Sequence, residues 1–369
     1  MGVPRNVHLP PGGAIPAHEP DSLLVRARRL FRRHGKKLWW IHSLYALGLG
    51  VSVVTFAQKG FDHVRWLAVT LGATWLLVVL FFRLFNRPTN DTNAAGGRAA
   101  SSPVKLRFYV MTYVLKNLYQ GMLFFLLPFY WKAATPGAPN FWFVLLLGAC
   151  ALLSTIDIIF DRFLMRFRLV ASAFHAITLF GCMNLVIPAL LPNTRTLWTL
   201  LSAAALTVIA FWTIHMRLGL LRDRRYVALL AASIPAGVAG AYWLRAEIPP
   251  APMYLSSAAV GPSLLPDGRL SMEVNNVHAS ALTQVIAVTD VVVPGGEGDR
   301  LVHVWRRGGV ALFRAPESTS RVRGPSGSVR LRSTILESQM PHDPVGKWSV
   351  DVETDDGQLV GRVPFSVVE

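Results

Sequence analysis

Seven long apolar stretches constrain the fold of this chain more than any other feature. A helix that crosses about 30 Å of hydrocarbon needs about 20 mainly apolar residues, because it rises 1.5 Å per residue. We therefore predict a membrane α-helical bundle of about seven spans. The predicted spans are Leu38–Gln58, Trp66–Phe82, Phe108–Trp131, Phe141–Phe160, Leu169–Leu191, Thr196–Met216 and Tyr226–Leu244.

The basic charge of the chain lies in this apolar part. The whole chain has 37 Lys and Arg against 21 Asp and Glu, a formal net charge of +16. Residues 1–253 contain 26 basic and 8 acidic residues, whereas residues 254–369 contain 11 and 13. Nucleic-acid binders carry their basic side chains on a soluble face or tail, so we expect no nucleic-acid partner. Only 16% of the residues are charged, and a soluble domain has about a quarter.

The loops between the predicted spans give the orientation, because cytoplasmic loops carry an excess of Lys and Arg. The N-terminal segment and the loops on its side hold twenty of these residues. The opposite side holds five, namely Lys59, Arg65, Lys132, Arg195 and Arg245. We therefore predict a multi-pass protein of the inner (plasma) membrane, with its N-terminus in the cytoplasm. With an odd number of spans, the C-terminal domain lies outside the cytoplasm.

Residues 1–37 form a basic segment on the cytoplasmic side. Asp21 can cap a short helix with one apolar face and arginines around the rest. Such a helix can lie on the inner leaflet and bind anionic lipid. The alternative is an anchor that follows the positive-inside rule and needs no specific lipid.

Polar side chains interrupt the cytoplasmic halves of several spans, where ionisable groups cost free energy and mark functional sites. One interpretation is a Lys–Asp pair plus interhelical hydrogen bonds that hold the bundle together. The other is a proton or ion relay, or a headgroup site. The candidate intramembrane residues are Lys116, Asn117, Gln120, Asp157, His175 and His215.

Few motifs in the sequence indicate catalysis or metal binding. Asp157 and Asp161 lie four residues apart at a helix end, a spacing that can hold Mg²⁺ against a pyrophosphate. Membrane prenyltransferases carry two such motifs, and this sequence lacks the second. Asp161 and Arg162 are therefore better explained as anchors at a helix end.

Cys150 and Cys182 fall inside spans and are predicted to pack there. No nucleophile elbow, zincin helix, P-loop or dinucleotide fingerprint occurs. We expect no catalytic residues, no metal and no cofactor.

After Leu244 the apolar residues alternate with period two, and turn signals separate short runs. This predicts an all-β immunoglobulin-like sandwich over residues 254–369, after the helical domain of residues 38–247. Trp305 and Trp348 are the core candidates. The predicted strands are Tyr254–Val260, Leu270–Val277, Thr283–Val292, Leu301–Trp305, Val310–Arg314, Thr319–Arg323, Ser328–Thr334, Trp348–Glu353 and Leu359–Val368.

One predicted hairpin has a basic face. If Gly324–Gly327 closes it, Arg321 lies opposite Arg330, with Arg323 and Arg332 on the same face. Opposed like charges destabilise a sheet, so we expect compensation from the acidic side chains of a neighbouring strand, Asp351 and Glu353. The alternative is that the face binds lipid headgroups, an anionic envelope polymer or an acidic protein.

The acidic residues near the C-terminus allow two interpretations as well. A solvated hairpin explains them better than a cation site does. They are Asp351, Glu353, Asp355 and Asp356.

The C-terminal third resembles a bacterial domain of unknown function, number 2914. The residues that carry the resemblance are His303-Val-Trp305, Gly346-Lys-Trp348-Ser-Val350-Asp-Val352-Glu-Thr-Asp-Asp-Gly357-Gln-Leu359-Val-Gly361-Arg and Pro364-Phe-Ser-Val367. The entering stretch Ile248-Pro-Pro-Ala-Pro is also similar to that family, which covers about the last 120 residues. The helical part resembles an uncharacterised multispan region often attached to the domain. One strand departs from the family, with Leu331-Arg332-Ser333-Thr334 in place of a Ser-Arg-Lys-like run. The resemblance implies a fold and a bacterial envelope context, but no activity.

Two functional hypotheses are compatible with the sequence. The first is a non-enzymatic protein of the cell envelope whose β-sandwich binds a partner protein, polymer or lipid outside the cytoplasm. The second is a transporter or intramembrane enzyme that uses the polar residues of the bundle.

Overall fold

The structure is a computed structural model that describes residues 64–85, 102–156, 159–160, 164, 167–191, 194–215, 222–293, 299–315, 322–323 and 328–369. Several predicted features lie outside these residues. They are the basic segment 1–37, the first span Leu38–Gln58, Asp157, Asp161, Arg162 and Arg321.

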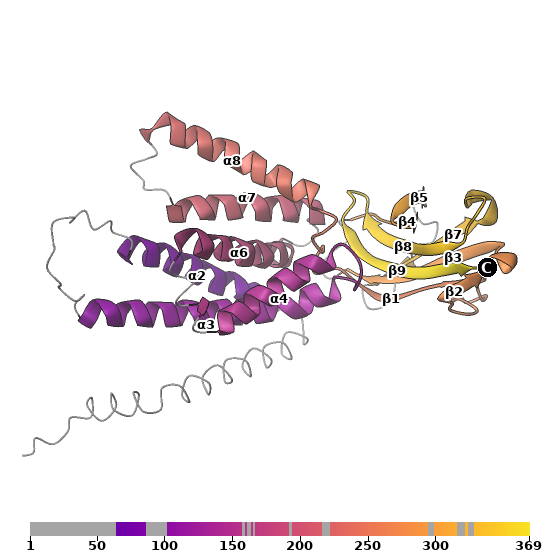
Figure 1. Ribbon diagram of the computed structural model, residues 1–369, viewed down its shortest axis with the longest axis horizontal. Helices are drawn as coiled ribbons and strands as arrows, with labels where there is room; N and C mark the ends of the chain where they lie inside the picture. Colours follow the sequence, from indigo (N-terminus) through magenta and orange to yellow (C-terminus); the bar gives the residue numbers. More distant parts are fainter. Residues whose placement is uncertain are drawn as a thin grey trace, which may run out of the picture. The chain divides into compact units, whose positions relative to one another are not determined.

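Six helices are described in the N-terminal part (Figure 1). They are α2 (Val64–Phe85), α3 (Ser102–Lys132), α4 (Phe141–Thr155), α6 (Arg168–Leu190), α7 (Thr196–His215) and α8 (Arg224–Trp243). Each overlaps one of the predicted spans two to seven. By length and composition, three segments can cross a membrane, namely Leu169–Leu190, Thr196–His215 and Arg224–Trp243.

The fourth predicted span is shorter as a helix than expected. Helix α4 has 15 residues and ends at Thr155, because the next residue, Ile156, has extended backbone with φ −90° and ψ 99°. The predicted span continued to Phe160. Fifteen residues rise only about 22 Å, so α4 alone is shorter than the hydrocarbon layer.

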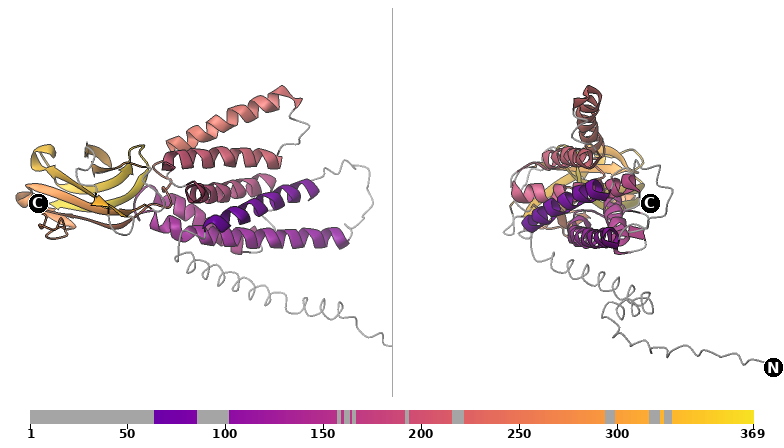
Figure 2. Two further views of the ribbon diagram at one scale, coloured as in Figure 1. Left: turned by 180° about the vertical axis from the view of Figure 1, so that it is seen from behind. Right: turned by 90° about the vertical axis from the view of Figure 1, so that its left-hand side faces the viewer.

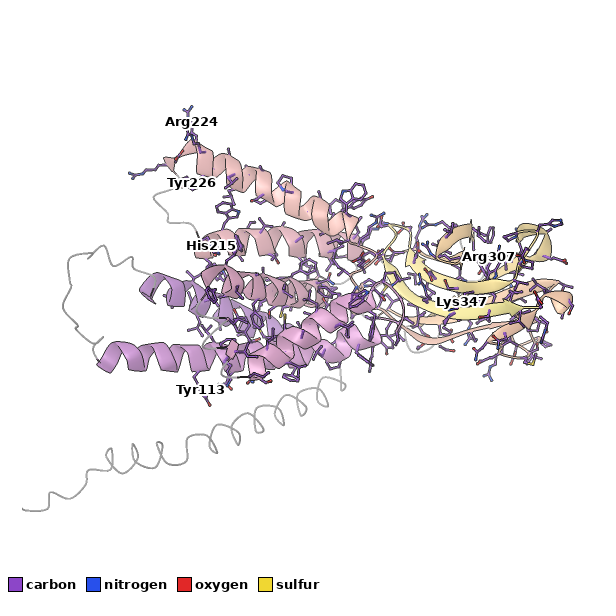
Figure 3. All side chains as sticks on the ribbon, viewed as in Figure 1. Tyr113, His215, Arg224, Tyr226, Arg307 and Lys347 are labelled. Carbon is purple, nitrogen blue, oxygen red and sulfur yellow. The ribbon has the colours of Figure 1, made fainter. Side chains whose placement is uncertain are left out.

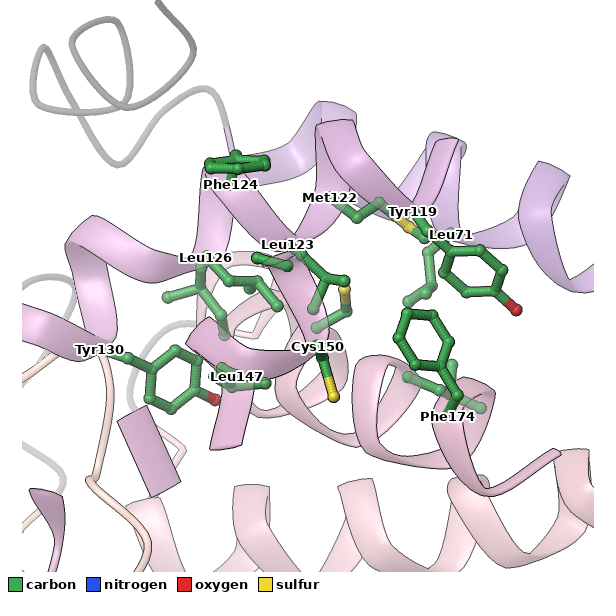
Figure 4. Packing of buried hydrophobic residues seen from close by; sticks show 14 of the residues in the cluster. Leu71, Tyr119, Met122, Leu123, Phe124, Leu126, Tyr130, Leu147, Cys150 and Phe174 are labelled. Carbon is green, nitrogen blue, oxygen red and sulfur yellow. The ribbon is translucent and has the colours of Figure 1, made fainter. Parts of the chain in front are cut away.

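The helices enclose a common apolar core (Figure 4). Leu71 of α2, Tyr119 of α3 and Phe174 of α6 are each at most 4% exposed. Cys150 and Cys182 are free and buried in the same core, as predicted for packing residues. Helix α8 lies at the margin of the helices beside α7 (Figure 2), and its apolar residues are largely exposed.

The C-terminal part forms two sheets (Figure 1). One has the strand order β1-β3-β7-β6 and the other β2-β9-β8-β4-β5. All pairs are antiparallel except β2 with β9. The strands are β1 (Tyr254–Gly261), β2 (Asn276–His278), β3 (Gln284–Val292), β4 (Leu301–Arg307), β5 (Val310–Arg314), β6 (Val322–Arg323), β7 (Ser328–Leu336), β8 (Gly346–Thr354) and β9 (Leu359–Val368).

The two sheets pack face to face through alternate residues. Val285 and Ile335 of the first sheet meet Val350 of the second in one buried cluster. Trp305 and Trp348, 0% and 2% exposed, belong to it, which confirms both as core residues. The predicted strand Leu270–Val277 is mostly wrong, since only Asn276–His278 pairs as a strand there. The preceding residues instead bond to the end of β1, with the Val274 N–H donating to the Val260 oxygen at 2.9 Å.

Candidate functional site

Buried polar side chains lie inside the helical bundle. Lys116 and Gln120, one turn apart on α3, are 3% and 4% exposed. Gln120 donates from Nε2 to the backbone oxygen of Ser154 in α4 at 3.2 Å. Asn117 is exposed and donates to the Tyr113 oxygen of its own helix at 2.8 Å. The structure therefore places Lys116 and Gln120 inside the bundle and Asn117 outside it.

A histidine–tyrosine pair joins α3 to α6. The Tyr119 hydroxyl lies 2.8 Å from Nδ1 of His175, and these side chains are 2% and 1% exposed. Phe174 packs edge-on against Tyr119, with ring centroids 5.0 Å apart. Nε2 of His175 is buried without a hydrogen-bond partner. Sequence reasoning missed Tyr119, because a tyrosine within an apolar stretch is typical of packing.

The second histidine belongs to α7 and contacts α6 about one turn from His175. His215 ends α7 (Figure 3), and its Nε2 is 2.6 Å from the Ser172 hydroxyl. Ser172 and His175 are three residues apart on α6 and so share a face. The predicted pair of Lys116 with Asp157 stays a prediction, because Asp157 lies outside the described residues.

The register of the basic hairpin differs from the predicted one. Val322 lies opposite Arg330 and Arg323 opposite Val329, so the pairing of Arg321 with Arg330 is wrong by one residue. Five residues lie between Arg323 and its partner Val329, one more than the four of Gly324–Gly327 that the prediction assumed. A slip of one residue moves every side chain of a strand to the other face.

Arg330 has an acidic partner in its own sheet. Its Nε and Nη2 lie 2.7 and 2.9 Å from the two oxygens of Asp290, which is directly opposite on β3. The hydrogen bond and charge of Asp290 raise the pKa of Arg330. The carboxylate that compensates the charge of Arg330 is therefore Asp290 of β3, and not Asp351 or Glu353 as predicted. This ion pair leaves less positive charge on the face for binding an anion. Arg332 is half-buried on the same strand, opposite Val288.

Asp351 and Glu353 form a buried ion-pair network on the second sheet. Asp351 is 1% exposed and accepts two hydrogen bonds of 2.7 Å from Arg362. Arg306 lies 2.8 Å from Asp351 and 2.6 Å from Glu353. A solvated hairpin is therefore wrong for these two residues, because two arginines cover them.

The helices and the β strands are joined by hydrogen bonds between distant parts of the chain. Asn140, which is fully buried before α4, donates from Nδ2 to the Leu359 oxygen at 2.9 Å. The Arg362 N–H donates to the Thr135 hydroxyl at 3.2 Å. More than 200 residues separate the partners in each bond. The sequence carries no local signal for such contacts.

Charged groups join the same two parts. Arg195, before α7, lies 2.6 Å from Asp355 and 2.9 Å from Asp356 in the turn between β8 and β9. Asp299 accepts from the Thr196 N–H with both oxygens, at 3.3 and 3.1 Å, and so caps the N-terminus of α7. Burial raises the pKa of Asp299, and the Thr196 N–H and Arg195 oppose this shift. Sequence reasoning had used Arg195 only as a topological marker and had missed Asp299.

Strand β5 forms one edge of the five-stranded sheet. Its alternate residues Val310 and Leu312 are 65% and 43% exposed. An edge strand offers unpaired backbone groups to another chain, and here apolar side chains lie beside them.

These features define a chain with apolar helices of membrane-crossing length, followed by a C-terminal region of two packed β-sheets. Residues 21–285 match the family of unknown function DUF5924, and this is more than half of the 369 residues. The chain belongs to that family. Residues 298–367 match the protein family of unknown function DUF2914, as the sequence resemblance indicated. The stretch from Ile248 lies within the DUF5924 match and not within the DUF2914 match. No significantly similar curated protein or solved structure was found.

Proposed function

We propose that this protein is a non-enzymatic, multi-pass protein of the bacterial inner membrane, whose β domain binds a protein in the periplasm. Seven predicted spans and an excess of twenty against five Lys and Arg support an N-terminus in the cytoplasm. The lengths and apolar composition of α6, α7 and α8 support insertion in the bilayer.

An immunoglobulin-like topology is part of this proposal. If the strands are named A, A′, B, C, C′, D, E, F and G in chain order, the first sheet is A-B-E-D. The second sheet then contains G-F-C, and both orders are those of immunoglobulin domains. Trp305 is buried on the strand that corresponds to C, the position of the core tryptophan in that fold. Domains of this kind commonly serve recognition, although a fold alone does not define a function.

The edge strand β5 is the observation that carries the binding proposal. An extended protein segment can add to a sheet edge through main-chain hydrogen bonds, with pockets or patches for alternate side chains. Val310 and Leu312 supply such an apolar patch at 65% and 43% exposure. The ion-paired junction of Arg195 with Asp355 and Asp356 holds the β domain on the helices, which suits a fixed docking platform.

Site-specific photo-crosslinking tests this proposal in the full-length chain in native membranes. A photoreactive residue in place of Leu312 should give a discrete protein adduct. A further Val310→Lys substitution should remove most of that adduct, because a charge replaces an exposed apolar contact. The matched control is Leu265→Lys, which changes an equally exposed leucine of a turn and should leave the adduct unchanged.

Other outcomes would overturn the proposed partner. Adducts only to lipid or to an envelope polymer would assign a different ligand to the domain. An adduct yield no higher at Leu312 than at Leu265 would show that β5 is not a binding edge.

A second function rests on the buried Nε2 of His175, which makes no hydrogen bond. In a transporter or intramembrane enzyme, this nitrogen would accept a proton or contact a substrate beside Tyr119. Proteoliposomes that contain a pH-sensitive dye test this alternative after an acid jump outside. Proton entry that His175→Phe abolishes, and that Asn117→Ala leaves intact, would favour this function over the binding proposal.

A further inference from the structure

A groove between α3 and α4 is lined by apolar residues along its length and by one charged residue, Lys132, at one end. The two helices lie side by side (Figure 1), and the groove encloses about 630 Å³. Pockets for small ligands enclose about 300–1,000 Å³. Leu145 and Leu152 of α4 line the groove and are 46% and 57% exposed. The groove therefore opens on the outside of the helices and not into their common core.

Small residues and a proline leave this space between the helices. Gly148 and Ala149 of α4 line the groove, and neither has a side chain larger than a methyl group. A Cβ on Gly148 would lie 3.9 Å from Cδ2 of Leu127 on α3, an ordinary van der Waals distance. Pro128 lies inside α3 and also lines the groove, and a proline within a helix removes one backbone hydrogen bond and bends the helix. The sequences of both helices thus produce the groove.

The length of the groove is close to that of one bilayer leaflet. Its lining runs from Phe124 to Lys132 on α3 and from Val144 to Leu152 on α4, and each segment rises about 12 Å. The hydrocarbon core is about 30 Å thick, so each leaflet contributes about 15 Å. Trp131, which is 58% exposed, lies at the same end as Lys132, and tryptophan and lysine favour the level of the headgroups. The rest of the lining then lies at the depth of the acyl chains.

Lys132 has no acidic partner in the part of the chain that the structure describes. Its Nζ lies 5.8 Å from the ring centroid of Tyr254, the first residue of β1, and an aromatic ring attracts a cation without neutralising its charge. A second groove, of about 490 Å³ and lined by residues of α4, α6, α7 and α8, has Glu247 as its single charged residue. The two grooves therefore differ in the sign of their charge, and the one at Lys132 suits an anion.

We propose that the groove between α3 and α4 binds an anionic phospholipid, with one acyl chain along the apolar lining and the phosphate beside Lys132. An acyl chain is apolar and flexible, so it can follow the groove over the depth of a leaflet. In the proposed orientation Lys132 lies on the periplasmic side, and the lipid therefore belongs to the outer leaflet of the inner membrane. This inference rests on the proposed insertion in the bilayer, but it does not depend on the partner of β5.

Photoreactive lipids test this site in the full-length chain reconstituted in phosphatidylcholine vesicles. The vesicles contain a trace of phosphatidylglycerol or of phosphatidylcholine with a photoreactive acyl chain, and mass spectrometry locates the adducts. Adducts at Leu145 and Leu152 should be about fivefold more frequent with the phosphatidylglycerol probe, the effect of one basic residue beside an anionic headgroup. Leu206 and Ile209 of α7 are exposed and do not line the groove, so they should react equally with both probes.

Variants separate the charge of the site from its shape. Lys132→Gln should remove the fivefold preference, and Lys132→Arg, which keeps the charge, should retain it. Glu247→Gln changes the charge of the second groove, and this matched control should leave the preference unchanged. Gly148→Leu should lower the adducts of both probes in the groove several-fold, because the larger side chain fills the space, and leucine is favourable within a helix. If Gly148→Leu does not fold, Lys132→Gln decides, since Lys132 is exposed.

Three other outcomes would overturn the proposal, and they differ in what they say about the proposed function. Equal adducts of both probes in the groove and on α7 would mean that the groove holds bulk lipid without preference. Adducts on α7 alone would mean that the chain itself fills the groove, for example with the predicted first span Leu38–Gln58. Both of these results leave the membrane protein in place. Adducts at neither position would show that the helices are outside the bilayer, and the proposed function would then fail together with the lipid site.

Discussion

A histidine inside the β core shows how one residue couples packing to pH. His303 is fully buried between the two sheets, with Nε2 2.8 Å from the Thr289 hydroxyl and Nδ1 2.7 Å from the Ser333 hydroxyl. Trp305 donates to the same Ser333 oxygen at 3.0 Å. The buried polar side chains of this core therefore hydrogen-bond to one another. The arrangement is stable with a neutral imidazole, because a charged one loses its hydration on burial.

The β domain should lose stability on acidification because of His303. Burial lowers the pKa of His303 to about 4, whereas in an unfolded chain it is about 6.5. The unfolded state thus takes up the proton first, and the free energy of unfolding falls as the pH drops from about 6.5 to about 4. The expected loss is about 3 kcal/mol, and it levels off below that range. Hydrogen exchange of the β4 and β7 amides across this pH range measures it. His303→Gln should remove the dependence of the unfolding free energy on pH between about 4 and 6.5, whereas His342→Gln, at an exposed histidine, should leave it unchanged. An equal dependence on pH in the wild-type chain and both variants would contradict this account.

A second residue-scale prediction concerns Asp351. Asparagine at this position leaves Arg306 and Arg362 partly buried without their shared carboxylate, which is 1% exposed. Removing one partner of a buried ion pair is strongly destabilising, so we expect a loss of about 3 kcal/mol for Asp351→Asn. Asp267→Asn breaks an exposed pair with Arg269 and should cost less than about 0.5 kcal/mol. Thermal unfolding of both variants in micelles provides the comparison, and similar midpoints would mean that the network contributes little.

At the scale of elements, the sequence predicted the helices and most strands but not how they meet. Apolar length and period-two alternation are local properties, so α6, α7 and β9 lie within a residue of their predicted positions. The register of β6 was wrong, because glycines allow connections of different length. The contacts of Asn140, Asp299 and Arg195 were not predictable, since they depend on tertiary packing between distant segments.

The contact between α7 and α8 gives an element-scale prediction with a control on the same helix. A Cβ on Gly237 would lie 2.6 Å from Cγ2 of Val208 on α7, whereas a Cβ on Gly240 would meet nothing within 4 Å. Valine is stiff about χ1, so the helices must shift to admit the methyl group. Gly237→Ala should therefore destabilise the chain by about 1–3 kcal/mol, and Gly240→Ala should be neutral or slightly stabilising. Thermal midpoints in micelles measure both, and equal midpoints would show that α7 and α8 do not pack closely at Gly237.

At the scale of the whole molecule, the two family matches do not coincide with the two structural parts. The first match, residues 21–285, includes β1 and β2, and the second, residues 298–367, begins just before β4. β1 pairs with β3 and β2 with β9, so neither match alone contains a complete pair of sheets. Asn140 and Thr135 then tie β9 to the loop between α3 and α4. The helical and β parts are therefore expected to fold interdependently.

The topology of the molecule is the last prediction. If the twenty basic residues lie in the cytoplasm, a cysteine at Leu265 in the β domain faces the periplasm and one at Arg224, the first residue of α8, faces the cytoplasm. A membrane-impermeant maleimide should label Leu265→Cys in intact spheroplasts, and Arg224→Cys only after permeabilisation. The native Cys150 and Cys182 are buried, so the background is low. Labelling of Arg224→Cys alone in intact spheroplasts would invert the orientation. Labelling of both would place the two ends of α8 on one side, and this would exclude α8 as a span, because a spanning helix must separate its ends by the full thickness of the bilayer.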